Sequence, residues 1–311
     1  MRLAVYEHPA CAAHETGQGH PERPERVAAV AEALRGAPFA DALDWRTAPR
    51  VEREALLRVH GEAYIDRVFA LAPEQGLVQV DADTVMGPHS LEASLRAAGA
   101  VVAATADVTV GRDARVFCNV RPPGHHAEGN KAMGFCLFDN VAVAAAAALA
   151  REDIARVAII DFDVHHGNGT EDIFADGSPF EGAVLFCSSF EHPLYPGTGA
   201  DTLSEHILNV PLPAGTGGDA FREAVGARWF DALDRFAPDL LFFSAGFDAH
   251  REDPLANLAL RAEDYAWITR AVREVTDGHT GGRIVSTLEG GYALDALGRS
   301  AAAHVGALLA D

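Results

Sequence analysis

The sequence predicts an α/β protein with a mainly parallel central sheet and helices on both faces. Short, uninterrupted apolar segments recur along the chain, which is typical of strands that are buried on both sides. Longer segments with helical character separate them, as the crossover connections of a parallel sheet require. The chain of 311 residues has no internal repeat, low-complexity tract or long polar linker, so we expect a single domain over residues 1–311.

Several segments are expected to be helical. Segment 21–36, PERPERVAAVAEALRG, has prolines near its start and a glycine at its end, which is the usual order at helix boundaries. In segment 139–152, either Asp139 or Asn140 can cap the amino terminus of the helix. The remaining segments expected to be helical are 90–111, 218–237, 261–276 and 293–310.

Polar groups follow most of the segments that we expect to be strands. These segments are 114–120, 156–162, 183–189, 239–247 and 283–291. The groups that follow are RPPGHHAEG after the first segment, DFDVHHGNG in the second, DAH after the fourth and Tyr292 after the fifth. Because the carboxyl ends of parallel strands lie at one edge of a sheet, where ligands bind in such folds, we expect these groups to meet there.

The composition narrows the range of functions. The 25 Lys and Arg against 45 Asp and Glu give a net charge of −20, which argues against nucleic acid as a partner. The charge is compatible with attraction of cationic substrates, and equally with a role in solubility alone. No apolar run is long enough to span a membrane, so no membrane partner is expected. The GxSxG, Walker A and HExxH motifs are absent, which argues against the mechanisms that use them.

The cysteines and the first residues predict a cytoplasmic protein. The sequence contains no CxxC pair, and three of its four cysteines lie in or beside apolar segments, so we expect buried reduced thiols. They are Cys11, Cys118, Cys136 and Cys187. The beginning of the chain, MRLAVYEHPACAAHE, lacks the apolar run of a signal peptide.

A metal site is the expected explanation for the acidic residues at the end of segment 156–162. In an extended segment, Asp161, Asp163 and His165 point to the same side. Two carboxylates are costly to bury unless a cation balances them. With Asp248 from another strand, Asp163 and His165 would form a three-ligand site with an open position, which is the catalytic pattern for Zn²⁺, and the same ligand types suit Fe²⁺. Taken singly, each side chain is more simply a hydrogen-bonded group at a strand end.

Two adjacent histidines and a tyrosine are further candidates for the site. His125 and His126 lie in a loop that two prolines restrict, and they are either two more ligands or a general base with an electrostatic partner. Asp161 and Asn168 are available to orient them. Tyr292 follows two glycines and can donate its hydroxyl to a carbonyl oxygen. The simpler interpretations are surface histidines in a turn and a tyrosine that only packs.

Taken together, these segments resemble the zinc-dependent histone deacetylase superfamily, which includes the acetylpolyamine amidohydrolases and has an arginase-like α/β fold. The matching segments cover nearly the whole chain in order: GHPERPERV, RPPGHHAEGNKAMGFCLFDN, DFDVHHGNGT, YPGTG, SAGFDAHREDPL and LEGGYAL. Asn168 stands where some relatives have aspartate, and in this the chain is similar to the class II branch.

The resemblance implies a role for each catalytic candidate. Zinc ligands are implied at Asp163, His165 and Asp248. His126 matches the histidine that acts as base, and His125 matches its partner. The resemblance also puts Asp161 behind His125, Asn168 behind His126, and Tyr292 at the scissile carbonyl.

The resemblance further implies a substrate tunnel and a structural K⁺. The tunnel residues are Gly134, Phe135 and Tyr195, Leu255 is a further substrate-binding position, and either Asp81 or Asp83 is expected to hold the substrate near the rim. The K⁺ site is built from the side chains of Asp161 and Ser188 and the backbone of Asp163, His165 and Ser189.

An acylated lysine side chain or a similar small acylated amine is the substrate that the resemblance implies. Leu255 stands where a polyamine-selective relative has a glutamate, which disfavours an acetylpolyamine deacetylase without excluding it. Two competing functions are a catalytically silent acyl-lysine or metal-binding module and an arginase-like ureohydrolase. A homo-oligomer is compatible with the resemblance.

Overall fold

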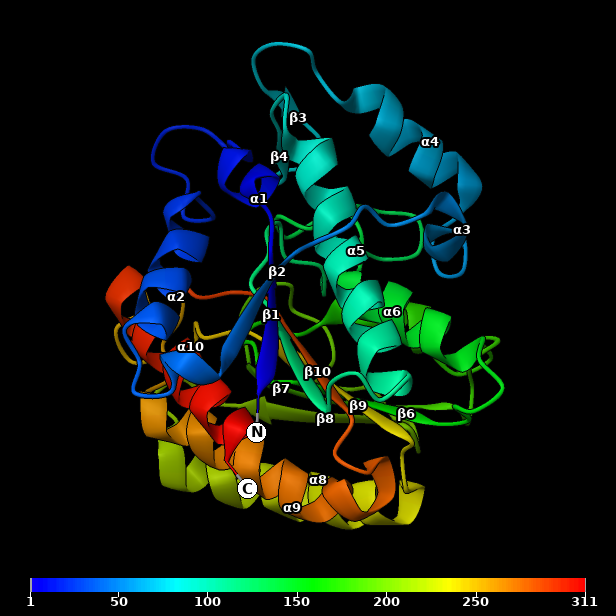
Figure 1. Cartoon of the computed structure of the whole chain (residues 1–311), viewed down its shortest axis with the longest axis vertical. Helices are drawn as coiled ribbons and strands as arrows, with labels where there is room; N and C mark the ends of the chain where they lie inside the picture. The colour runs from blue at the N-terminus through cyan, green and yellow to red at the C-terminus, as the bar shows by residue number, and fades with distance from the viewer. Residues whose placement is uncertain (1, 311) are drawn as a thin grey trace.

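The computed structural model describes residues 2–310, which form an eight-stranded sheet with helices on both faces (Figure 1). All neighbouring strands are parallel, in the order β2-β1-β5-β10-β9-β6-β7-β8. The strands are β1 (Leu3–Glu7), β2 (Leu43–Thr47), β5 (Arg115–Cys118), β6 (Val157–Asp161), β7 (Val184–Glu191), β8 (Ile207–Leu212), β9 (Leu240–Ala245) and β10 (Ile284–Leu288). The predicted fold class is therefore confirmed.

The helices divide into two layers because successive strand residues face opposite sides of the sheet. Ile160 and Phe243 pack with the first layer of helices, and Ile159 and Phe242 pack with the second layer. The first layer contains α2 (Glu25–Arg35), α8 (Gly218–Phe236), α9 (Ala262–Thr280) and α10 (Leu294–Leu309). The second layer contains α1 (Pro9–Ala13), α5 (Ser90–Thr109), α6 (Asn140–Leu149) and α7 (Asn168–Phe174).

A smaller apolar cluster lies above α5 and α6. Tyr64, Ile65 and Val68 of α4 pack there with Leu137 and Phe138. The elements of this region are η1 (Ala40–Ala42), which leads into β2, α3 (Arg53–Leu56), α4 (Glu62–Leu71), and the antiparallel pair β3 (Val78–Gln79) and β4 (Val85–Met86). The loop between β3 and β4 carries Asp83 toward the site described below.

The predicted helices and strands are all present, with boundaries that differ by a few residues. The cap of α6 is Asp139, whose carboxylate accepts a hydrogen bond from the amide of Ala142 at 2.8 Å. Strands β1, β2 and β8 were not predicted. β2 and β8 are the two edges of the sheet, and polar residues or Pro211 interrupt their apolar pattern.

The sheet order brings the predicted polar groups together. β5, β10, β9 and β6 are consecutive in the sheet, so the loops after them begin side by side at its carboxyl edge. All four cysteines are buried, as expected. Within residues 2–310, no helix combines the length and the apolar character needed to cross a membrane.

Candidate active site

Three side chains from two neighbouring strands converge at the carboxyl edge of the sheet. Asp163 and His165 follow β6, and Asp248 follows β9, which pairs with β6. One ligand atom from each of the three residues lies within 4.8 Å of the others, and all three residues are buried. The structure thus brings together the three predicted ligands, whose sequence separation is up to 85 residues (248 − 163 = 85).

The hydrogen bonds of these three residues leave one buried carboxylate oxygen, Oδ2 of Asp248, without a donor among residues 2–310. Asp163 accepts hydrogen bonds from the amides of His165 and Gly290, at 2.9 and 2.8 Å. Asp248 Oδ1 accepts from the amide of Val164 at 2.9 Å, but in the described part of the chain no hydrogen bond reaches Asp248 Oδ2. His165 Nδ1 lies 3.2 Å from that oxygen and 3.1 Å from Asp163 Oδ1. Two carboxylates and one imidazole nitrogen are a donor set that suits Zn²⁺.

The pKa values point to the same need for a cation. In the absence of an ion, burial and the charge of Asp163 raise the pKa of Asp248 to about 7. Burial lowers the pKa of His165, but its contacts with Asp163 and Asp248 outweigh burial and raise the pKa to about 10. A divalent cation can take the place of these protons. The residues present therefore fit a metal ion.

Two glycines make room for the carboxylates. A Cβ atom at Gly246 would lie 2.0 Å from Asp163 Oδ2, and one at Gly290 would lie 2.0 Å from Asp248 Oδ2. These contacts are closer than any van der Waals separation, so any larger residue would displace a candidate ligand.

The two adjacent histidines lie side by side but in different electrostatic surroundings. Their ring centroids are 4.0 Å apart. His125 Nδ1 is 2.9 Å from Asp161 Oδ2, and His126 Nδ1 is 2.8 Å from Asn168 Oδ1. Burial lowers the pKa of His125, but the charges of Asp161 and Asp163 raise it well above its usual value. Burial and the charge of His125 hold the pKa of His126 well below its usual value, so His126 is neutral and can accept a proton.

A cavity of about 230 Å³ gives access to these groups. Most of the predicted catalytic and tunnel residues line it: His125, His126, His165, Tyr292, Gly134, Phe135, Tyr195, Leu255 and Asp83, together with Pro123 and Gly290. The Asp83 carboxylate accepts from the amide of Gly134 at 3.0 Å and so fixes one wall. Gly134 has a φ of 57°, and a Cβ atom there would lie 2.3 Å from the His126 ring. A glycine is therefore required where this wall meets the histidine.

Asp161 and Ser188 lie opposite each other in the paired strands β6 and β7. The Asp161 carboxylate accepts from the amide of Asp163 at 3.0 Å in addition to its contact with His125. The hydroxyl oxygen of Ser188 is buried, and it has no hydrogen-bond partner among residues 2–310. Such an orphaned oxygen beside a carboxylate fits a cation that is coordinated by oxygen atoms.

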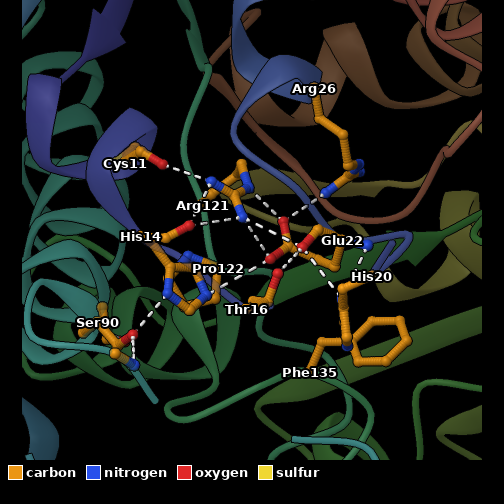
Figure 2. A network of polar contacts seen from close by, with 12 residues as sticks. Cys11, His14, Thr16, His20, Glu22, Arg26, Ser90, Arg121, Pro122 and Phe135 are labelled. Carbon is orange, nitrogen blue, oxygen red and sulfur yellow. Dashed lines mark hydrogen bonds and ion pairs between the residues drawn. The ribbon is translucent and has the colours of Figure 1, made fainter. Parts of the chain in front are cut away.

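A buried charge cluster that the sequence did not predict lies beside the loop that carries His125 and His126 and the loop that carries Tyr292 (Figure 2). The Glu22 carboxylate accepts from Arg121 in a two-point contact, and from Arg26 at 3.1 Å. His14 Nε2 lies 3.4 Å from the same carboxylate. Burial raises the pKa of Glu22, but the charge of Arg121 and the hydrogen bonds outweigh it and hold the pKa well below its usual value. Arg121 begins the loop that carries His125 and His126.

Arg26 extends this cluster to the loop that carries Tyr292. Its guanidinium donates to the carbonyl oxygens of Glu289 and of Gly291, the latter at 2.6 Å. It also lies 4.8 Å from the centre of the Tyr292 ring. From the other side, Asp253 Oδ2 accepts from the Tyr292 amide at 2.7 Å. The position of Tyr292 is thus fixed by groups from two separate segments, which contribute Arg26 and Asp253.

Glu289 is a further buried acid that the sequence motifs did not single out. Its carboxylate accepts from the amides of Gly124 and His125, at 2.6 and 3.2 Å, and from the Ser244 hydroxyl at 2.9 Å. Burial raises its pKa to about 7. Glu289 follows β10 directly, so the signal that selected Asp161, a charge at the end of a buried strand, was available for Glu289 as well.

The comparison with known families agrees with this geometry. Residues 20–308 match the family model of the histone deacetylase domain. The chain belongs to the histone deacetylase family. A histone deacetylase-like amidohydrolase of Pseudomonas aeruginosa is 39% identical over 277 residues, which are 88% of this chain and 73% of that protein. A probable deacetylase of Archaeoglobus fulgidus is 33% identical, over 95% of this chain and 82% of its own length.

Solved structures of histone deacetylases have the same fold. The crystal structure of the HDA15 HD domain superposes with a TM-score of 0.91 and 34% identity, over 99% of this chain and 90% of that one. The resemblance stated from the sequence motifs is therefore confirmed. These two relatives are named as an amidohydrolase and a probable deacetylase.

Proposed function

We propose that this histone deacetylase family protein removes acyl groups from acylated amines with the help of Zn²⁺ held by Asp163, His165 and Asp248. The observation that carries the proposal is the convergence of these three ligand atoms next to a cavity that two histidines and Tyr292 also line. Fe²⁺ suits the same ligands and is an alternative ion. The Ser188 hydroxyl that lacks a partner among residues 2–310 supports a structural K⁺ between it and Asp161.

The chain's own residues can carry out the remaining chemistry. An ion in this site would polarise an amide carbonyl and lower the pKa of a water molecule. His126, which is neutral, accepts the proton of the attacking water and later gives it to the amine nitrogen as the C–N bond breaks. Tyr292 donates its hydroxyl to the carbonyl oxygen as negative charge develops there. The products are a carboxylate, usually acetate, and a free amine.

Each of the two histidine partners serves this chemistry differently. Without bound ions, the charges of Asp161 and Asp163 hold the pKa of His125 well above its usual value despite burial, and a positively charged His125 would favour the negative charge of the transition state. Asn168 carries no charge, so it orients His126 without raising its proton affinity as much as a carboxylate would. His126 therefore stays neutral near neutral pH, so its ring is free to take up a proton when His125 already carries one.

We propose acylated lysine side chains as the substrate class rather than acetylpolyamines. Leu255 lines the cavity and offers no charge for the second ammonium group of a polyamine. Asp83, whose carboxylate already holds the cavity wall, is the candidate for contact with the substrate backbone at the entrance. The four buried cysteines are consistent with a reducing compartment such as the cytoplasm.

A substrate panel with metal-quantified protein tests the proposal. Acyl-lysine peptides of several chain lengths are compared with acetylspermidine, and the released carboxylate and amine are measured. We expect turnover of at least one acyl-lysine peptide and slower turnover of acetylspermidine. Faster turnover of acetylspermidine would establish a polyamine deacetylase, and no turnover of any compound by metal-loaded protein would indicate a binding module.

A further inference from the structure

Asn168 is held between a histidine and a carboxylate. Its Oδ1 lies 2.8 Å from His126 Nδ1, and its Nδ2 donates to Glu128 Oε1 at 2.9 Å. Nδ2 also lies 3.3 Å from the Met133 sulfur. In the part of the chain that the structure describes, no ion pair involves Glu128, and the bond to Asn168 is the one hydrogen bond of its carboxylate. Neither the mechanism above nor the sequence motifs give this carboxylate a role.

The direction of these hydrogen bonds follows from donor and acceptor chemistry. An ionised carboxylate only accepts hydrogen bonds, so the group that Asn168 turns toward Glu128 must be its NH₂. The amide oxygen of Asn168 then faces His126. That oxygen also only accepts, so Nδ1 of His126 must carry the proton, and the lone pair of the neutral ring is on Nε2.

Asn168 alone does not fix this direction. Its two ends are nearly equal in shape, and if the amide turned over, its NH₂ would face His126 and require an unprotonated Nδ1. The proton of the neutral ring would then be on Nε2, and His126 could not accept a proton there. The Met133 sulfur is a weak acceptor and opposes this rotation only slightly. Relatives with aspartate in place of asparagine would not face this ambiguity, since a carboxylate accepts through both oxygens.

We propose that Glu128 is a positioning residue that sets the tautomer of His126 through the Asn168 amide. The proposal rests on the proposed function, because the tautomer matters for catalysis only if His126 is the base. In this arrangement Nδ1 of His126 donates to the Asn168 amide oxygen, and the Asn168 NH₂ donates to the Glu128 carboxylate. Because the carboxylate can only accept, it fixes both directions and leaves the lone pair on Nε2 of His126. The arrangement needs asparagine in the middle, so the effect of Glu128 depends on what residue occupies position 168.

The backbone around Glu128 is fixed without its side chain, which makes a conservative substitution informative. The Glu128 amide donates to the carbonyl of Lys131 at 2.9 Å, and the Glu128 carbonyl lies 3.2 Å from His60 Nδ1. Glu128→Gln keeps the size of the side chain and these backbone bonds. It replaces an obligatory acceptor with an amide that can present either end to Asn168.

Kinetics of four proteins test the proposal: the unaltered chain, Glu128→Gln, Asn168→Asp and the double variant. Each is measured with an acyl-lysine peptide at equal metal content. With Asn168 present, Glu128→Gln should lower kcat by about tenfold or more, within the contribution of a positioned base, and change KM less than about twofold. In the Asn168→Asp background, the same change should raise kcat, because it removes a like charge next to the introduced carboxylate. Glu152→Gln, at an exposed position, is the control for the loss of one charge.

An equal loss of kcat in both backgrounds, or no loss with Asn168 present, would overturn the proposal. A nitrogen-15 NMR measurement of the His126 ring keeps the test independent of activity, with the signal assigned by comparison with His126→Gln. The unaltered protein should show Nδ1 protonated and Nε2 not, and Glu128→Gln should show a mixture. An unchanged ring in Glu128→Gln would reject the role of Glu128, whereas absence of turnover in the unaltered protein would count only against the proposed function.

Discussion

Two groups of fully buried charges lie beside the cavity, and they are balanced in opposite ways. Glu22 contacts Arg26 and Arg121, so the chain supplies its own cations and the pKa of Glu22 is held well below its usual value. Asp248 lies next to Asp163, and burial beside this second carboxylate raises its pKa to about 7. Burial alone therefore does not distinguish a structural carboxylate from a metal ligand. The presence or absence of a guanidinium within contact distance does.

The contrast predicts that removing one carboxylate has different consequences in the two groups. In the first group the chain loses a charge that balances two arginines, so folding suffers. In the second group it loses a charge that a bound ion would balance, so the ion and the chemistry suffer instead. Activity, metal content and the free energy of unfolding separate these outcomes.

The largest effect is expected for Asp163→Ala, which removes the carboxylate that lies within 4.8 Å of the ligand atoms of both His165 and Asp248. We expect bound metal and turnover to be lost together, since two of three protein ligands do not hold a catalytic ion tightly. Metal content by elemental analysis and hydrolysis of an acyl-lysine peptide are measured on the same sample. A variant that keeps a full equivalent of metal would contradict the ligand assignment.

Glu22→Gln should reduce the free energy of unfolding by about 3–5 kcal/mol, because it leaves Arg121 buried without its partner charge. Denaturant unfolding of the metal-free protein measures this effect without interference from metal binding. Glu252→Gln is the matched control: Glu252 pairs with Arg299 on the surface, where both side chains are half exposed, so its midpoint should not change. Equal midpoints for the two variants would show that the buried cluster does not stabilise the fold.

A smaller effect, confined to turnover, is expected for Tyr292→Phe. The ring remains under Arg26, so the charge cluster is preserved, and no metal ligand changes. Loss of the hydroxyl removes one donor to the developing oxyanion, which costs on the order of a hundredfold in kcat. Metal content and unfolding midpoint should equal those of the unaltered protein. Unchanged kcat would remove Tyr292 from the mechanism.

The parts of the site that could be predicted from the sequence are those that follow predictable strands. Asp163, Asp248 and Tyr292 each come shortly after a continuous apolar segment, and the geometry of parallel sheets then places them at one edge. The resemblance to a known family added the tunnel residues, such as Tyr195, which lie in loops without any periodic signal. Both kinds of prediction depend on local sequence.

The charge cluster around Glu22 could not be predicted in this way. Arg121 follows a predicted strand, but Glu22 is 99 positions away in a segment without a strand pattern, so no local signal pairs the two residues. The edge strands β2 and β8 were missed for a related reason, since a strand paired on one side only does not need a continuous apolar run. Contacts between charged residues that are distant in sequence, and the addition of edge strands to a sheet, depend on the assembled fold and not on the local sequence.

The smallest expected effect is the release of protons when metal binds, which should occur in the group of Asp163, His165 and Asp248 but has no counterpart at Glu22. Without an ion, the pKa of His165 is about 10 and that of Asp248 about 7, so at pH 7 His165 holds a proton and Asp248 holds one part of the time, whereas Glu22 holds none. A metal ion must displace these protons. Both pKa values are raised, so the displaced protons decrease and the affinity for metal increases as the pH rises through them. Titration calorimetry at pH 7, in buffers of different ionisation enthalpy, should show release of about one to two protons for each ion bound.

Comparison of pH 6 with pH 8 identifies the source of these protons. Release from Asp248 and His165 decreases as the pH rises, because Asp248 is already ionised above about pH 7. Ionisation of a water molecule on the bound ion would give the opposite trend, since it becomes more complete at higher pH. Proton release that grows from pH 6 to pH 8 would therefore show that the acids of this group are ionised without the ion, as Glu22 is. The two groups would then differ in their ligands and not in their charge balance.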